Sequence, residues 1–438
     1  MSERTDAERR VGWARLWARA KQIVTTDPSG SDEDDQVVDE EAARALAVAA
    51  GKLKGGLAKV AQLAAYDPSF GGRSGATAAA RAVLGGLWDH APAVSSDAIA
   101  RVFEEDLGRP PSVLFAKWDT RPHAAASIGQ VHAATLADGT EIVVKVQYPG
   151  VAEALRKDLD DAGFVRRLAG VAIGRSLDDA AVVTLAAAVR DELDYRLEAK
   201  AQQRFAAAWA DHAILRVPRV IGELSSGRVL AMVRATGKTV VETAGIGDPD
   251  IRKQAALAIF DYAWGSPLAH GLLNADPNPG NFLVEQLADG GIHVWCLDFG
   301  CAMELPEVVR DADREIWWGL LDDDFASASE RFRMGIAKAG LLRRADSLAS
   351  SAHRDWERAL ALPIQTHGDF HWSREYVAEL SSATGRALGA GGLGLPAKLL
   401  LLWRQRLGAS AVLGLLDARA PFRRVLADRI GTGRKALR

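Results

Sequence analysis

The sequence predicts an α+β fold, because short β-type runs occur in several places and helical patterns fill most of the remaining chain. The clearest β-type runs are Ile128–Leu136 with Glu141–Gln147, and Phe282–Val284 with the apolar run that ends before Asp298. Helical patterns are clearest over Asp250–Trp264 and in the chain after Glu304. Both kinds of element are long enough to form a mixed fold with a sizeable core.

Length and composition predict a globular protein of two or three domains. Of 438 residues, 25% are charged and 48% are hydrophobic, as in ordinary globular chains. The net charge of −3 argues against a nucleic-acid-binding protein, which usually carries a basic excess. Two cysteines, Cys296 and Cys301, are too few for a disulfide framework or a zinc site. We interpret them as small buried residues in a reducing cytosol, with redox sensing as the second interpretation.

The N-terminal region lacks the basic, apolar and small-residue order of a signal peptide. Residues 7–24 form a basic amphipathic pattern with Trp13 and Trp17, and the acidic run 29–35 predicts a mobile linker. Two interpretations of the basic helix stay open, contact with an anionic membrane surface and the commoner packing on the protein body. We expect a cytoplasmic protein, with peripheral membrane contact as the alternative.

No run of apolar residues is long enough to predict a transmembrane helix. The nearest candidate, Ala397–Leu416, is interrupted by Lys398, Arg404 and Arg406. We therefore predict a buried or amphipathic helix there.

An alanine-rich helical pattern covers residues 40–66 and contains the glycine pair Gly55-Gly56. Glycines inside a helix cost stability, so this pair indicates a close approach to another element. Lys59 and Gln62 lie three residues apart and share one face of the predicted helix. Taken alone, they are a surface pair.

Lys145 interrupts the apolar run of the second predicted strand, Glu141–Gln147. A lysine in such a strand must place its ammonium against a useful partner or incur a desolvation cost. In kinases a strand lysine of this kind binds nucleotide phosphates and pairs with a helical glutamate. The alternative is an edge-strand lysine that prevents aggregation.

The segment before this hairpin, His123–Gln130, is rich in alanine where a kinase would have a glycine-rich loop. Its Ala124, Ala125, Ala126 and Ser127 can offer backbone N–H groups to phosphate, with less conformational freedom than glycines give. Judged alone, this segment predicts no function.

Two helices are predicted next, over Val151–Ala172 and Asp178–His212. Within the second helix Asp194 and Glu198 share a face, whereas Glu192 points elsewhere. One of these acids is the natural partner of Lys145, although a solvated charged face competes with that interpretation. Strands are predicted at Val217–Leu224 and Arg228–Val233, with a hinge at Ala235–Gly237.

Three polar residues surround the second pair of β-type runs. Asp276 and Asn281 have the spacing Asp-x-x-x-x-Asn, and Asp298 begins an Asp-Phe-Gly triplet. A phosphoryl-transfer site of the protein-kinase type needs this order, with one aspartate to accept the substrate proton and an asparagine and a second aspartate to bind Mg²⁺. The alternative is that Asp276 and Asn281 cap turns in a proline-rich loop.

The ordered series of motifs resembles the UbiB/AarF family of atypical protein-kinase-like proteins. The matching motifs begin at Ala124, Val143, Glu192, Ala275 and Leu297, and read AAASIGQVH, VVKVQYPG, ELDYRLE, ADPNPGN and LDFG. The match runs from about Gly51 to Met303, and the C-terminal remainder matches only in being helical.

The resemblance implies a bilobal protein-kinase-like fold, with a small β-rich N-lobe, a helical C-lobe and an N-terminal helical extension. It divides the chain into four parts: a basic helix and acidic linker (1–39), the extension with its Lys-x-Gly-Gln-like motif (40–112), the N-lobe (113–235) and the C-lobe (236–438). This sequence has Ala61 where the motif has glycine, and Asn274 and Asn278 where histidine is common in the loop.

The resemblance also implies roles for individual residues. Lys145 would bind the phosphates of ATP or ADP and pair with Glu198, while Ala124–Ser127 would cover the phosphates. Asp276 would be the base, Asn281 and Asp298 would bind Mg²⁺, and Glu192 and Asp194 would lie near the metal. Lys59 and Gln62 would fold over the substrate site and restrain protein-kinase activity.

The implied function is an atypical kinase or ATPase linked to ubiquinone or other isoprenoid-lipid metabolism, with a quinone precursor or isoprenoid lipid as partner. No Ala-Pro-Glu triplet follows the Asp-Phe-Gly motif, so a dedicated protein kinase is not expected. Two alternatives stay open: a nucleotide-binding regulatory module without productive turnover, and a small-molecule phosphotransferase of the antibiotic or choline type.

Overall fold

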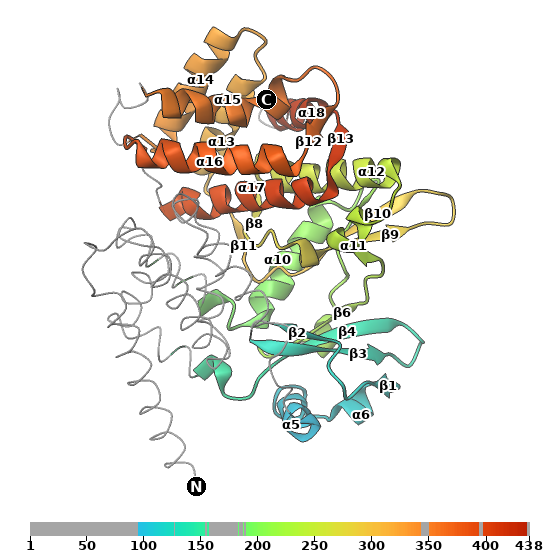
Figure 1. Ribbon diagram of the computed structural model, residues 1–438. Helices are drawn as coiled ribbons and strands as arrows, with labels where there is room; N and C mark the ends of the chain where they lie inside the picture. The colour runs from blue at the N-terminus through green and yellow to red at the C-terminus, as the bar shows by residue number, and fades with distance from the viewer. Residues whose placement is uncertain are drawn as a thin grey trace, which may run out of the picture.

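The protein is described by a computed structural model over residues 95–435, apart from residues 127, 343–349 and 394–396 and most of 154–189. The predictions for residues 7–24, 29–35 and 40–66, including Lys59 and Gln62, lie outside the described residues, as does most of the predicted helix Val151–Ala172. The predicted two-lobed α+β fold is confirmed: a β-rich lobe lies at one end of the molecule and a helical lobe at the other, as Figure 1 shows.

The smaller lobe is built on a five-stranded antiparallel sheet in the order β1-β3-β4-β6, with β2 paired to β3. Its strands are β1 (Lys117–Trp118), β2 (Ala124–Ala126), β3 (Gly129–Thr135), β4 (Glu141–Gln147) and β6 (Val229–Val233). The hairpin predicted around Asp138-Gly139 is confirmed, because β3 and β4 pair from Thr135↔Glu141 to Gly129↔Gln147.

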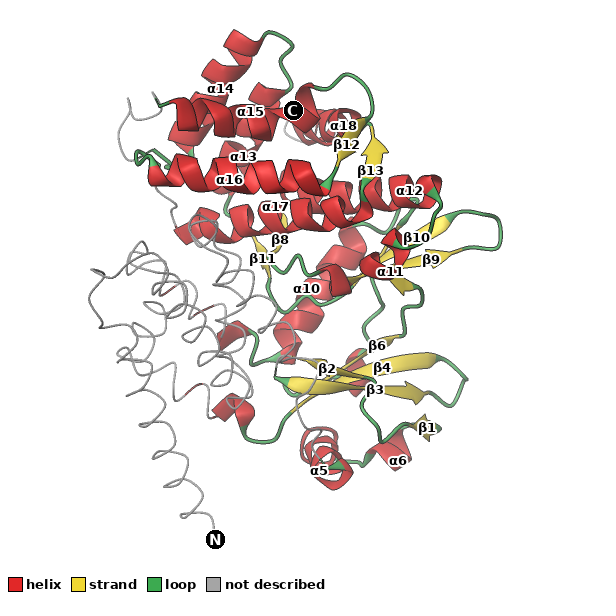
Figure 2. Cartoon of the chain, viewed as in Figure 1, coloured by secondary structure: helices red, strands yellow, loops and turns green. Residues whose placement is uncertain are grey.

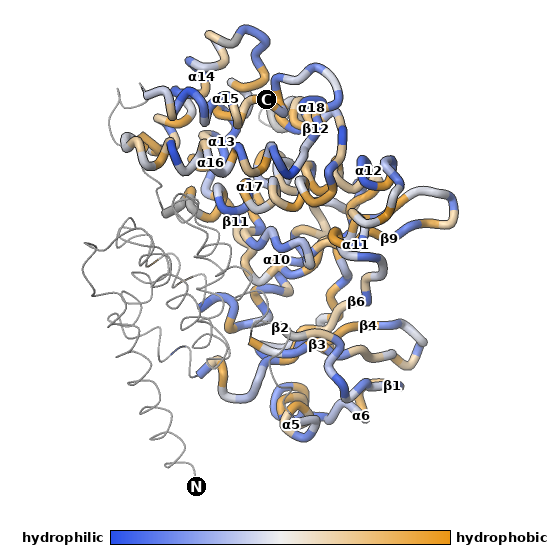
Figure 3. Tube along the Cα trace, viewed as in Figure 1, coloured by the Kyte–Doolittle hydropathy of each residue, from blue (hydrophilic) through white to orange (hydrophobic). Residues whose placement is uncertain are grey.

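One face of this sheet is covered by helix α5 (Ser96–Leu107), with the short helix α6 (Pro111–Leu114) beside it. Alternation along β4 buries Ile142, Val144 and Val146 in a cluster with the apolar face of α5. Figure 3 shows both apolar and polar residues along α5, as expected of a helix with one buried face. Residues 96–107, assigned to the extension by sequence, thus pack into the core of the first sheet.

Helix α10 (Tyr195–Ala208) connects the two lobes. The sequence predicted one helix from about Asp178 to His212, but the helix is interrupted before Tyr195, and α10 ends at Ala208. A turn at Glu192 and Leu193 precedes the helix, and Asp194 is its N-cap. A short polar side chain that accepts a backbone N–H favours such a start over a continuing helix.

A second sheet lies in the helical lobe, in the order β5-β10-β9-β7. Its strands are β5 (Leu215–Arg216), β7 (Lys238–Thr239), β9 (Phe282–Gln286) and β10 (Ile292–Cys296), and a separate pair is β8 (Leu272–Asn274) with β11 (Ala302–Glu304). The predicted strand Val217–Leu224 is wrong. Pro218 has no N–H to donate, and this stretch forms only the bridge Val220↔Met232 and the 3-10 turn η3 (Gly222–Leu224).

Helices make up the rest of the larger lobe, as Figure 2 shows. They are α11 (Val240–Ala244), α12 (Pro249–Phe260), η4 (Asp261–His270), η5 (Pro279–Asn281), α13 (Glu307–Leu320), α14 (Phe325–Lys338), α15 (Ser351–Gln365), α16 (Arg374–Gly389), α17 (Ala397–Leu416) and α18 (Phe422–Lys435), with the strand pair β12 (Phe370–Trp372) and β13 (Ala418–Ala420). The helix predicted over Asp250–Trp264 extends further, because η4 continues α12 as a π-helix that accommodates Pro267.

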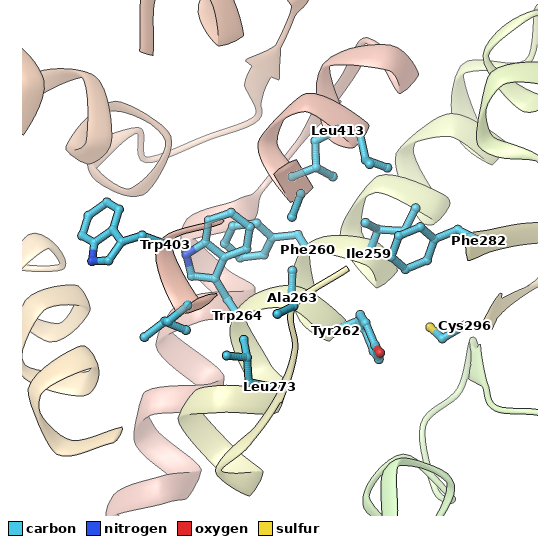
Figure 4. Close-up of a cluster of buried hydrophobic side chains, with 14 of the residues drawn as sticks. Ile259, Phe260, Tyr262, Ala263, Trp264, Leu273, Phe282, Cys296, Trp403 and Leu413 are labelled. Atoms are coloured by element: carbon cyan, nitrogen blue, oxygen red, sulfur yellow. The ribbon is translucent and has the colours of Figure 1, made fainter. Parts of the chain in front are cut away.

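The core of the larger lobe is rich in aromatic side chains. Phe260 stacks on Trp264 with ring centroids 4.4 Å apart, and Trp264 meets Trp317 edge to face. Figure 4 shows this cluster around η4, with Tyr262 extending from the same element toward Cys296. Helix η4 leads into β8, the strand that precedes the loop carrying Asp276.

Helix α17 confirms the sequence prediction of a buried helix over Ala397–Leu416. Its arginines Arg404 and Arg406 are 5% and 3% exposed. In the described part of the chain, no helix combines the length and the apolar composition needed to cross a membrane.

Candidate active site

Lys145 lies on the face of β4 opposite α5, between the two lobes. Its ammonium nitrogen lies 2.6 Å from Glu198 Oε1 and 3.7 Å from Asp298 Oδ2. Burial alone would lower the pKa of Lys145, but the Asp298 and Glu198 carboxylates outweigh burial and raise it. Lys145 is therefore a fixed positive charge at neutral pH, held between two acidic groups.

Glu198 comes from the first turn of α10 and joins β4 to the Asp-Phe-Gly segment. Besides the Lys145 ammonium, its Oε1 accepts the backbone N–H of Phe299 at 3.4 Å. The Glu198 side chain is 4% exposed. A buried carboxylate needs such partners, so the position of Glu198 depends on Lys145 and on the Phe299 backbone together.

The other two acids of the Glu-Leu-Asp segment lie differently from the sequence prediction. Asp194 caps α10 by accepting the N–H of Arg196 at 3.0 Å, so it is not on a shared helical face with Glu198. Glu192 is 7% exposed, and its Oε1 accepts the thiol of Cys301 at 2.8 Å. The turn before α10 thus directs Glu192, and not Asp194, toward the segment that follows Asp298.

Asp276 and Asn281 lie at the two ends of the loop between β8 and β9. The Asn281 side-chain amide donates to both the carbonyl and the Oδ2 of Asp276, each at 3.2 Å. The 3-10 turn η5 brings them together, with Asn278 accepting the N–H of Gly280. Asp276 is 7% exposed, although it lies in a loop.

Asn274 ties this loop to the Asp-Phe-Gly segment. Its amide nitrogen donates to the Asp298 carbonyl at 2.9 Å and to the Tyr262 hydroxyl at 3.1 Å, while its oxygen accepts the Asp276 N–H at 3.2 Å. The sequence identified Asn274 only as a departure from the family pattern. Its contacts assign it a structural role between the two segments.

Asp298 has a backbone φ of 53°, in the left-handed region that non-glycine residues rarely adopt. Its Oδ1 accepts the N–H of Gly300 at 3.1 Å, and its side chain is 32% exposed. A strained residue with an accessible carboxylate next to Lys145 is typical of a functional site.

The alanine-rich segment is not a free loop. Ala124–Ala126 form β2, which pairs with Gly129–Val131 of β3 in a tight hairpin, and Ser127 lies outside the described residues. Gly129 lies so close to β4 that an added Cβ would come within 2.2 Å of the Val146 carbonyl oxygen. The predicted phosphate lid is therefore a β-paired turn at the edge of the site.

The described residues contain no cluster of three or more His, Cys, Asp or Glu side chains arranged to hold a metal ion. Glu192, Asp194 and Asp298 therefore do not converge as a three-carboxylate site. Mg²⁺ is commonly held by one or two protein oxygens together with phosphates and water. The accessible carboxylate of Asp298 and the amide oxygen of Asn281 fit that donor set.

The two cysteines differ. Cys296 is buried in β10, and burial raises its pKa, in agreement with its interpretation as a small core residue. Cys301 is only half-buried, and its thiol donates to Glu192. Cys301 packs against the core, so its interpretation as a small buried residue is confirmed only in part.

The sequence of this chain is similar to one family model and to several known proteins. The family model described as "ABC1 atypical kinase-like domain" matches residues 86–332. The Rv0647c protein of Mycobacterium tuberculosis is 30% identical over 349 residues, which cover 76% of this chain and 67% of that protein. The atypical mitochondrial kinase COQ8B of Rattus norvegicus is 35% identical over 228 residues, 49% of this chain and 42% of its own length.

A solved structure from Mycobacterium tuberculosis resembles this chain over most of its length. The Rv3197–erythromycin complex from Mycobacterium tuberculosis aligns with a TM-score of 0.62 and 30% identity, covering 78% of this chain and 85% of the other.

Proposed function

This chain belongs to the ABC1 atypical kinase-like family, and on that premise we propose that it binds a magnesium nucleotide between its lobes and transfers or hydrolyses the terminal phosphoryl group. The observation that carries the proposal is the convergence of Lys145, Glu198 and Asp298 from β4, α10 and the segment after β10. In a phosphoryl-transfer site, catalysis depends mainly on positioning and on charge stabilisation.

Each residue of this site has a proposed role. Lys145 binds the phosphates, and Glu198 holds the lysine in place. Asn281 and Asp298 would hold Mg²⁺, with Glu192 as a further candidate near the metal, and the bound ion would neutralise phosphate charge. Asp276 orients the attacking hydroxyl or water and accepts its proton.

The acceptor is proposed from the family and from the chain's own sequence. Kinase names among the relatives support a phosphotransferase, and we propose a small molecule linked to ubiquinone or isoprenoid-lipid metabolism as the acceptor. After Asp298 the chain passes through the short strand β11 directly into α13, which leaves no long segment to hold a peptide. Quinone-precursor-like phenols and anionic liposomes are therefore the first additives to test.

The test is ATP turnover by the purified full chain with Mg²⁺, compared with Asp298→Asn. Asparagine tolerates the left-handed backbone at this position, so the variant removes the charge with little strain. We expect a loss of about 100-fold or more in kcat, as for removal of a group that acts in the transition state. Asp289→Asn is the matched control, because Asp289 caps the β9–β10 turn away from this cluster. Equal turnover by wild type and Asp298→Asn would refute the proposal.

A regulatory module that binds nucleotide without turnover is the second candidate. The β-paired turn at Ala124–Ala126 favours it, because such a turn has less freedom to close over phosphates than a glycine-rich loop. Lys59 and Gln62, outside the described residues, are proposed to restrain the site. Thermal stabilisation by Mg-ADP without phosphate release under any additive would favour this candidate.

A further inference from the structure

Helix α17 packs directly against the loop that carries Asp276. Two residues one turn apart make this contact. Arg404 Nη2 lies 3.5 Å from Asp276 Oδ1, and a Cβ added to Gly408 would lie 2.1 Å from the Cγ of Pro277. Residues four apart share a helix face, so Arg404 and Gly408 form one surface on which Asp276 and Pro277 rest.

The Asp276 carboxylate is held from two sides. One oxygen faces the Arg404 guanidinium, and the other accepts the Asn281 amide at 3.2 Å. The side chains of Arg404 and Asp276 are 5% and 7% exposed, so both charges are removed from water. A buried carboxylate is strongly destabilising without a compensating charge, and Arg404 supplies that charge from a segment 128 positions further along the chain.

We propose that Arg404 is a positioning residue for the catalytic loop: its buried guanidinium fixes the orientation of the Asp276 carboxylate, while Gly408 provides the space for Pro277. Arg404 acts through Asp276 and does not itself contact the reacting atoms. Its catalytic effect rests on the proposed function, whereas its effect on the loop does not.

A purely architectural role for Arg404 is the competing explanation, and the same helix provides the comparison. Arg406 is equally buried, pairs with Asp313 at 2.8 Å and lies over the ring of Trp264 with its guanidinium carbon 4.7 Å from the ring centroid. Its contacts therefore anchor α17 to α13 and η4, away from Asp276. Replacing either arginine with methionine removes a buried charge from α17, but only the replacement of Arg404 removes a direct contact to the loop.

The experiment uses the full chain and the variants Arg404→Met, Arg404→Lys and Arg406→Met, at a temperature where all are folded. Hydrogen exchange of the amides in residues 275–281 reports on the loop without requiring turnover. We expect Arg404→Met to accelerate exchange there by about tenfold or more, and Arg406→Met to leave it near the wild-type rate. Arg404→Lys retains the charge and should restore part of the protection.

Steady-state kinetics of ATP turnover complete the test. Arg404→Met should lower kcat by about 100-fold with KM for ATP changed by no more than about threefold, because the carboxylate is misplaced while the nucleotide-binding residues remain. Arg404→Lys should recover part of kcat, and Arg406→Met should keep it per folded molecule.

Unchanged loop exchange in Arg404→Met would overturn the positioning role, as would equal effects of both methionine variants on the loop and on kcat. If the wild type hydrolyses no ATP, the proposed function fails, and the exchange experiment still decides for or against positioning by Arg404.

Discussion

Glu198 shows how single side chains join segments that are far apart in this protein. One of its oxygens receives the Lys145 ammonium from β4 and the Phe299 N–H from the Asp-Phe-Gly segment. Asn274 does the same on the other side of Asp298, through its contacts to the Asp298 carbonyl and the Asp276 N–H. The arrangement of the site thus depends on a few buried polar side chains, each with partners from different elements.

His132 provides a prediction of pH dependence at the residue scale. It is 1% exposed on β3, where its ring nitrogens contact the Asp119 carbonyl at 2.8 Å and the Gln130 amide at 2.9 Å. Burial lowers the pKa of His132 below its ordinary value. The folded protein therefore favours the neutral ring. The stability that the neutral ring contributes is fully present above the pKa of His132 in the unfolded chain, and it is lost as the pH falls through the pKa of His132 in the folded protein.

We expect His132→Gln to reduce the free energy of unfolding by about 1–2 kcal/mol near pH 7.5, because buried hydrogen bonds are lost. Near pH 5.5, about one unit below the ordinary histidine pKa, the difference in the free energy of unfolding between wild type and variant should become smaller. Only the wild type loses stability through protonation of this ring. Denaturant unfolding at both pH values measures this difference. His123 is exposed, so His123→Gln serves as the control. A difference in the free energy of unfolding between wild type and His132→Gln that grows in acid would contradict the prediction.

The sequence identified most residues of the candidate site but not their supports. Lys145, Asp276, Asn281 and Asp298 stand out because their types and spacing match a known chemistry. Arg404 does not, because its partner is 128 positions away and a basic residue in a helical pattern is usually solvated. Only the packing of α17 on the loop reveals its contact.

At the scale of elements, the accuracy of the sequence predictions follows the strength of the local pattern. The β3–β4 hairpin was predictable, because alternation and an Asp-Gly turn act together. The break before α10 and the failure of Val217–Leu224 to form a strand were not predicted. In both cases a single residue, the N-cap Asp194 or Pro218, overrides an otherwise consistent local pattern.

Gly408 allows the role of α17 to be tested at this scale. Gly408→Ala should improve the intrinsic helix propensity of α17 by about 1 kcal/mol but force Pro277 away from the helix. Overpacking of this kind typically costs about 1–3 kcal/mol, and here the displaced group belongs to the loop that carries Asp276. We therefore expect a small change in melting temperature and a clear fall in ATP turnover.

Gly414→Ala is the matched control for this prediction. It lies on the same helix, and its added Cβ would lie 2.7 Å from Val377 Cγ2 of α16, away from the loop. We expect a comparable change in melting temperature with turnover per folded molecule preserved. A loss of turnover shared by both variants would mean that any disturbance of α17 inactivates the protein, against a specific contact with Pro277.

At the scale of the whole molecule, the described residues form two hydrophobic clusters of unequal extent. The smaller cluster lies between α5 and the first sheet and includes Phe103 and Val144. The larger cluster begins on the other side of that sheet, at Ile128 and Leu230, continues through Phe205 of α10 and fills the helical lobe. The larger cluster therefore extends through both lobes, and the candidate site lies where this cluster passes from one lobe to the other.

Phe205 lies in the part of the core that α10 contributes and is 1% exposed. Its ring centroid is 5.1 Å from that of Phe299 and 5.6 Å from that of Tyr262. Phe205→Ala should cost about 3–5 kcal/mol of stability through the cavity it leaves. Because Phe299 loses its support, we also expect faster hydrogen exchange in residues 298–301 and weaker stabilisation by Mg-ADP.

Phe103→Ala is the control that distinguishes a general loss of stability from loss of the contact between α10 and Phe299. Phe103 is fully buried in the smaller cluster, where it meets Phe115 and Trp118 edge to face. The same truncation there should cost a similar free energy, about 3–5 kcal/mol, while residues 298–301 keep their wild-type exchange rates. If both variants accelerate hydrogen exchange in residues 298–301 equally, the two clusters behave as one cooperative unit. In that case α10 does not specifically link Lys145 to Asp298.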